Sequence, residues 1–109
     1  MKAGPGQPGD FASLPARGRV ELTGYVESVT YPASGAAEVF RAGLVPDLAG
    51  PGSAHPRPRV ELAWLGQRAV PGVKQGVWLK VTGMLTRMHG EATMHDPRYE
   101  IVAVEQEEA

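Results

Sequence analysis

The side chains best suited to binding chemistry in this sequence are arginines and tyrosines set among apolar residues. A guanidinium group can form two parallel hydrogen bonds with a phosphate, and a tyrosine ring can stack on a nucleobase. Five such residues are expected on the outer side of strands or in the loops beside them: Tyr25, Tyr31, Arg41, Arg59 and Arg87. Their combination predicts a surface for single-stranded nucleic acid.

Acidic side chains on the same segments allow a second interpretation of these arginines. Glu21, Glu27 and Glu61 share the outward parity of their predicted strands. Arg41 could pair with Glu61, or Arg59 with Glu27, in cross-strand ion pairs that add little stability and serve no ligand. The sequence leaves both interpretations open.

The other polar residues do not form a recognisable catalytic or metal-binding pattern. No G-x-S-x-G elbow, no phosphate-binding loop and no poised pair of carboxylates is present. The chain has no cysteine, so a thiolate metal site and a disulfide are both excluded. A metal would depend on His89, His95 and Asp96, but the strand is expected to carry His95 away from His89 at the hairpin tip. We therefore expect no enzyme activity, no cofactor and no metal.

The apolar periodicity that positions these residues begins near Arg19. Three residues then share the parity of a half-buried strand: Val20, Leu22 and Val26. The apolar parity moves afterwards to Val29 and Tyr31, which predicts a bulge or sharp bend between Gly24 and Ser28. A small barrel needs such a bend so that one long strand can serve both halves of its wall.

Two further strands are expected at Glu38–Val45 and Arg59–Leu65. Alternate residues of both point to a common core: Phe40, Ala42, Leu44, Val60, Leu62 and Trp64. Residues 46–58, which lie between these strands, contain four prolines and two glycines. This composition predicts a long exposed loop.

The fourth strand is expected at Val77–Arg87, after a 67–75 segment in which Pro71 and Gly72 allow a short helical turn at most. Its inward residues are Val77, Leu79, Val81 and Leu85, whereas Trp78 has the outward parity. His89-Gly90 predicts a hairpin turn.

A fifth strand is expected at Glu91–Val104, interrupted at Pro97, which cannot donate a ladder hydrogen bond. Beyond this interruption we expect Tyr99 and Ile101 on the barrel and Arg98 in solvent.

The order of these elements predicts an all-β fold, a five-stranded OB-fold Greek-key barrel. Residues 1–17 are expected to form a disordered Gly/Pro-rich arm, residues 18–104 the barrel, and residues 105–109 an acidic tail. Whether Phe11 and Leu14 dock on the barrel is not decided by the sequence.

The stretch from Trp64 to Ile101 carries a resemblance to known proteins. It reads WLGQR, then PGV, then GVWLKVTG, and closes with DPRYEI. It resembles the second half of stand-alone bacterial OB-fold nucleic-acid-binding proteins and of the wedge domain of the RecG helicase. The likeness covers roughly residues 18–104, and Asp96 to Glu100 match an Asn/His-Pro-x-Tyr-Glu motif. The resemblance implies a module that binds single-stranded or branched nucleic acid.

Charge limits the strength of any such binding. The chain has a formal net charge of −1, and residues 18–104 hold nine basic and eight acidic side chains. A near-neutral barrel predicts weak attraction to phosphate, and it also suits the alternative, a protein–protein interaction domain with no nucleic-acid ligand. No signal peptide or membrane span is evident, so we expect a soluble cytoplasmic protein.

Overall fold

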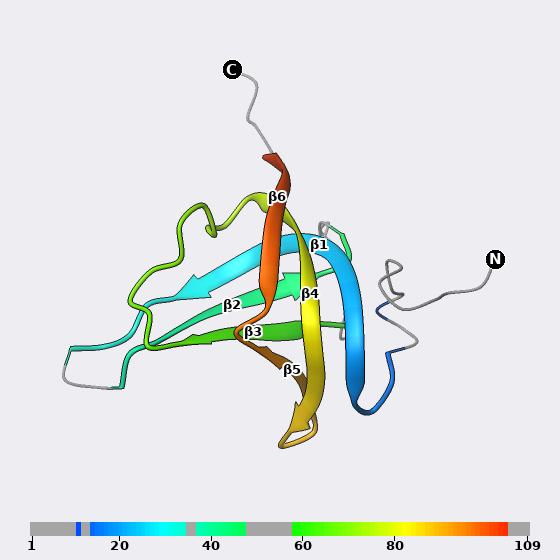
Figure 1. The fold of residues 1–109 in the computed structure, drawn as a ribbon. Coiled ribbons are helices and arrows are strands. Elements are labelled where there is room, and N and C mark those ends of the chain that lie inside the picture. The colour runs from blue at the N-terminus through cyan, green and yellow to red at the C-terminus, as the bar shows by residue number, and fades with distance from the viewer. Residues whose placement is uncertain (1–10, 12–13, 35–36, 48–57, 105–109) are drawn as a thin grey trace, which may run out of the picture.

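The structure is a computed structural model that describes residues 11, 14–34, 37–47 and 58–104. Its described residues form strands joined by turns and contain no α-helix. The strands of the described residues, labelled in Figure 1, are β1 (Gly18–Thr30), β2 (Val39–Val45), β3 (Val60–Leu65), β4 (Val77–Met88), β5 (Glu91–His95) and β6 (Arg98–Val104). None of the described residues belongs to a helix that could cross a membrane.

The sheet closes on itself as a five-stranded barrel. Its order is β1-β2-β3-β5-β4, and a direct pairing of β1 with β4 completes the ring. Strands β3 and β5 run parallel, while the other neighbours in the ring are antiparallel. This mixed Greek-key ring is the predicted OB-type barrel, and β6 is an additional strand beside β4.

The length of β1 and its bulge allow the ring to close. Residues 18–25 pair with β4, and residues 25–30 pair with β2. The register with β2 shifts between Val26 and Ser28, inside the predicted interval, so Glu27 is the extra residue of a β-bulge. Gly24 lies at the bend, where an added Cβ would stand 2.6 Å from the carbonyl oxygen of Val45. Glycine is therefore required there by the close approach of β2.

The predicted inward parity accounts for most of the core. Its buried residues from the five barrel strands include Leu22, Val26, Phe40, Leu44, Val60, Leu62, Trp64, Leu79, Val81, Leu85 and Met94. Val20 and Val29 are partly buried and pack against this cluster. Leu62 is fully buried at the centre of β3, as the barrel fold requires.

The β4–β5 connection is the predicted two-residue hairpin turn. His89 and Gly90 both have positive φ, 55° and 85°, between the paired residues Met88 and Glu91. Two consecutive positive φ angles are typical of a type I′ turn, which matches the twist of the strands that it joins.

The fifth predicted strand is interrupted at Asp96 and Pro97, which separate β5 from β6. Both halves pair along the same edge of β4, β5 with residues 85–88 and β6 with residues 77–82. Tyr99 packs against the core and Arg98 is exposed, as predicted. Ile101 is opposite the buried Leu79 and lies against Gly72 of the 67–75 segment, as predicted for a residue on the barrel, but 43% of it stays exposed.

The residues of the interruption fasten β3 to the end of β5. The backbone N–H of Asp96 donates to Ala63 O at 2.7 Å, and Asp96 Oδ1 accepts from the N–H of Leu65 at 3.0 Å. The indole Nε1 of the buried Trp64 donates to Pro97 O at 3.1 Å. Asp96 holds φ at 52°, a conformation that aspartate tolerates better than most residues. The motif Asp96–Glu100 therefore has a structural role, since its first two residues join the end of β3 to the end of β5 by hydrogen bonds.

Part of the predicted N-terminal arm belongs to the core. Phe11 is buried within the apolar cluster and Leu14 packs against it. The other predicted features of irregular sequence, namely most of the arm, most of the 46–58 loop and the acidic tail, lie outside the described residues. Residues 67–75 form turns, with a hydrogen bond from Val73 N to Val70 O, in line with the short turn expected there.

Candidate functional site

The outer surface of β2, β3 and β5 presents the polar side chains of these strands. Gly43 on β2 is opposite Glu61 on β3, and Glu61 is opposite Thr93 on β5. Residues directly opposite one another in a sheet point to the same side, so this row lies on one surface. Arg59 directly precedes β3, and Arg41 is two residues before Gly43 on β2. We call this surface the β2–β3–β5 face.

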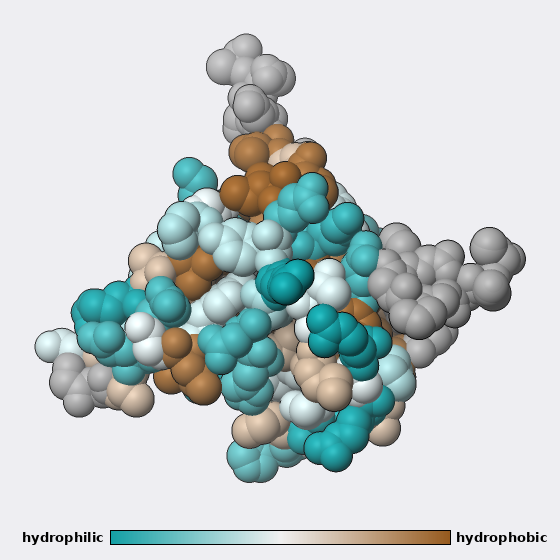
Figure 2. All heavy atoms as spheres, viewed as in Figure 1, coloured by the Kyte–Doolittle hydropathy of each residue, from teal (hydrophilic) through white to brown (hydrophobic). Residues whose placement is uncertain are grey.

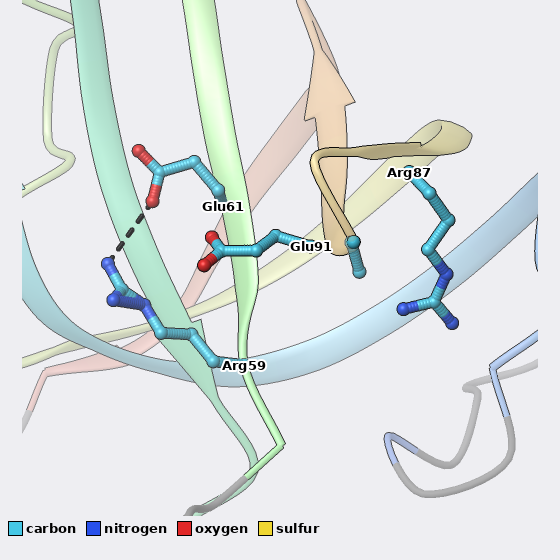
Figure 3. A pocket seen from close by; sticks show the side chains of 6 residues that line it. Arg59, Glu61, Arg87 and Glu91 are labelled. Atoms are coloured by element: carbon cyan, nitrogen blue, oxygen red, sulfur yellow. Dashed lines mark hydrogen bonds and ion pairs between the residues drawn. The ribbon is translucent and has the colours of Figure 1, made fainter.

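An open hollow of about 310 Å³ lies between the start of β3 and the turn of the β4–β5 hairpin. Its polar lining comes from Arg59, Glu61, Arg87 and Glu91. Figure 3 shows the Glu91 side chain directed toward Arg59, and the Arg87 side chain on the opposite side of Glu91 from Arg59. The hollow thus has a cationic group at each side and carboxylates between them.

A second hollow, of about 440 Å³, adjoins the first. Arg41, His89 and His95 line it, and Glu61 and Glu91 border both hollows. The structure therefore brings the three predicted arginines around one continuous surface.

Arg59 lies across the middle of the β2–β3–β5 face. Its Nη2 donates to Glu61 Oε1 at 3.1 Å, and its Nε is 3.7 Å from Glu27 Oε2. The guanidinium covers Gly43, because an added Cβ at that residue would overlap it. Glu27 is the bulged residue of β1, so the bulge that closes the barrel also supplies one of the two carboxylates that hold Arg59.

Arg41 and Arg87 are held more loosely. Arg41 Nη1 lies 3.8 Å from Glu61 Oε2, and 48% of the Arg41 side chain is exposed. Arg87 Nη2 donates to the backbone oxygen of Pro15 at 3.4 Å. The cross-strand pairs Arg41–Glu61 and Arg59–Glu27, considered from the sequence as an alternative to ligand binding, are thus both present.

The two predicted tyrosines do not join the arginines on this face. Tyr25 is opposite Trp78 in the β1–β4 pairing, and the two rings meet edge to face with centroids 5.4 Å apart. Tyr31 follows β1 and meets the buried Phe40 ring at 5.2 Å, although 58% of Tyr31 is exposed. Of the two, Tyr31 presents more ring surface to solvent.

Sequence reasoning did not single out Glu91 and Thr93, which border the hollows on β5, Glu91 as an exposed residue and Thr93 as one that is only 5% exposed. The alternation of β5, with Ala92 and Met94 inward, was the signal that could have placed them outward. His89, expected beside Arg87 at the loop next to the binding face, and His95, considered for metal binding only, both line the second hollow. Among the described residues no group of three or more His, Asp and Glu side chains is placed to hold a metal ion.

Comparison with known proteins gives no match to a family model, a curated protein or a solved structure. The chain is thus defined by its architecture, an OB-type barrel of five strands with one added edge strand. The likeness to OB-fold nucleic-acid-binding proteins and to the RecG wedge domain stays a prediction from the sequence.

Proposed function

We propose that this protein is a non-catalytic module that binds single-stranded or branched nucleic acid, DNA or RNA, weakly on its β2–β3–β5 face. One observation carries the proposal: Arg41, Arg59 and Arg87 surround two adjoining hollows on that face. OB barrels bind oligonucleotides with the surface of their second and third strands and the adjacent loops. A cytoplasmic location, expected from the sequence, belongs to the same proposal.

The ion pairs of the arginines are compatible with this role. The side chains of Arg41 and Arg59 are 48% and 44% exposed, and exposed ion pairs contribute about 0–1 kcal/mol. A phosphate forms charge-assisted, bidentate hydrogen bonds with a guanidinium group. A bound strand can therefore displace Glu27 and Glu61 at modest cost.

The same carboxylates keep the affinity low. The face sets three guanidinium groups against the carboxylates of Glu27, Glu61 and Glu91, so it attracts phosphate weakly at long range. Each phosphate contacted by a single strand lowers log K by about 0.7 per log unit of salt. We expect a shallow salt dependence, set by two or three contacts.

Fluorescence anisotropy with labelled single-stranded DNA and RNA, at a low and a high salt concentration, tests the proposal. Arg41→Ala/Arg59→Ala should remove most of the salt-dependent part of the binding and leave only the contact made by Arg87. The matched control is Arg68→Ala/Arg98→Ala, which removes the same charge from exposed residues off the face. Binding that both double variants weaken equally would contradict the proposed site, because it would reflect net charge alone.

A protein partner is the second candidate ligand for this face. The observation that favours it is the pairing of Arg41 and Arg59 with carboxylates, which leaves a surface of mixed charge suited to polar protein contacts. The absence of any nucleic-acid binding at low salt in the same titration would favour this alternative.

A further inference from the structure

Strand β6 leaves one of its edges open. In the sheet order β6 stands last, and among the described strands it pairs only with β4. The other edge of β6 therefore presents backbone N–H and C=O groups that no described strand satisfies. Such an edge is a template for pairing with another chain.

The end of this strand is also apolar. Ile101, Val102 and Val104 are 43%, 46% and 54% exposed, and the residues between Glu100 and Glu105 are all apolar. Figure 2 shows this apolar surface gathered at the C-terminal end of β6. β-Branched residues favour the extended conformation, so the strand keeps its shape where it passes the barrel rim.

The usual protections of an exposed edge are largely missing here. Edges are commonly shielded by lysine, proline, charged side chains or bulges. Residues 101–104 have none of the first three, although Arg98 and Glu100 earlier in β6 are charged and Gly72 lies against Ile101. One bulge is present, because Leu79 is opposite Ile101 whereas Trp78 is opposite Ala103, and it leaves Val102 without a partner on β4.

The charges at the two ends of β6 indicate which kind of strand would pair with its open edge. The strand begins with Arg98, and Val104 is followed in the sequence by Glu105, Glu107 and Glu108. Antiparallel pairing with a second copy puts the arginine end of each strand beside the acidic end of the other. We propose that this edge is a self-association surface, on which β6 of two copies pair antiparallel about a two-fold axis.

A two-fold axis makes this contact self-complementary and closed. The same edge of both copies is used, so no further copy can add to it. The interface consists of one seven-residue strand on each side, which is at the small end of protein interfaces. The dimer should therefore be weak and should form reversibly as the protein concentration rises.

Sedimentation velocity across a concentration series tests the proposal. The wild-type chain should pass from monomer to dimer and stop there. Val102→Lys and Val104→Lys each place a charge on the open edge and should shift the transition to concentrations at least about tenfold higher, as expected for a charge placed against an apolar contact. Met84→Lys is the matched control, since Met84 is an equally exposed apolar residue of β4, and it should dimerise as the wild type does.

Charge reversal tests the orientation. Arg98→Glu should weaken the dimer at low salt and less so at high salt, because the opposed ends would then carry like charges. Hydrogen exchange at residues 98–104 should slow as the dimer forms. The proposal is overturned by a chain that stays monomeric throughout, by assemblies larger than dimers, or by a dimer that both lysine variants retain.

Discussion

Gly43→Ala should change the position of the Arg59 guanidinium group without removing any charge. The new methyl group would occupy the position of the Arg59 guanidinium, which lies across Gly43 between two carboxylates. The guanidinium is the end of a flexible side chain, so it can move away. Gly43 has no left-handed φ, so alanine fits the strand. The substitution should therefore separate Arg59 from Glu27 and Glu61 while the barrel stays folded.

The effect on stability should be small because two terms oppose each other. Loss of two exposed ion pairs costs about 0.2–1 kcal/mol each. Replacement of glycine by alanine within a strand raises the free energy of unfolding by about 0.5–1 kcal/mol. Urea denaturation should show a free energy of unfolding between about 0.6 kcal/mol above and about 1.5 kcal/mol below that of the wild type.

The effect on nucleic-acid affinity should be larger. In the wild type a phosphate must displace both carboxylates from Arg59, whereas in the variant they are already displaced. The free energy of the two ion pairs, about 0.4–2 kcal/mol in total, no longer opposes binding. The variant should therefore bind about 2- to 30-fold more tightly. Anisotropy titration measures it, and Gly43→Ala in an Arg59→Ala background is the control that should show no gain. If Gly43→Ala binds with unchanged affinity while Arg59→Ala binds more weakly, the carboxylates do not compete with the ligand and our reasoning is wrong.

Three further predictions concern the barrel and are measured by chemical denaturation. Leu62→Ala should lower the free energy of unfolding by about 2–5 kcal/mol, because Leu62 is fully buried; a loss below about 1 kcal/mol would contradict its central place in the core. Trp64→Phe should cost about 1–3 kcal/mol, because Pro97 O loses its buried donor. Tyr99→Phe removes the more exposed hydrogen bond to Pro71 O and should cost only about 0.5–1.5 kcal/mol, so a larger loss than for Trp64→Phe would reverse this ranking.

Periodicity predicted the barrel because each strand buries one parity. The shift of parity after Val26 located the bulge, and His89-Gly90 located the hairpin, since both are local consequences of residue type. Ile101 has the predicted parity and lies against Gly72, yet 43% of it stays exposed. Parity gives the side of a strand to which a residue points, but the segments packed beside the strand decide how fully the residue is covered.

The candidate site was harder to predict because its contacts depend on register. Tyr25 was placed outward, but its partner Trp78 follows from the β1–β4 pairing, which only closure of the ring fixes. Burial of Phe11 has the same origin, because the apolar site beside Gly24 and Leu44 that Phe11 fills exists only when β1 and β2 have paired. Outward parity was sufficient to anticipate the pairs of Arg41 and Arg59, since neighbouring strands carried glutamates of the same parity.

The motif from Asp96 to Glu100 argues for the fold and says little about the ligand. Asp96 accepts a hydrogen bond from the end of β3, Pro97 accepts one from Trp64, and the Tyr99 ring meets the Trp64 ring at 5.7 Å. These residues are occupied in joining β3, β5 and β6. A chain could keep this motif for its barrel and bind something quite different. We therefore look for function on surfaces that these residues do not form. The two surfaces proposed here are the arginine-bearing β2–β3–β5 face and the open edge of β6.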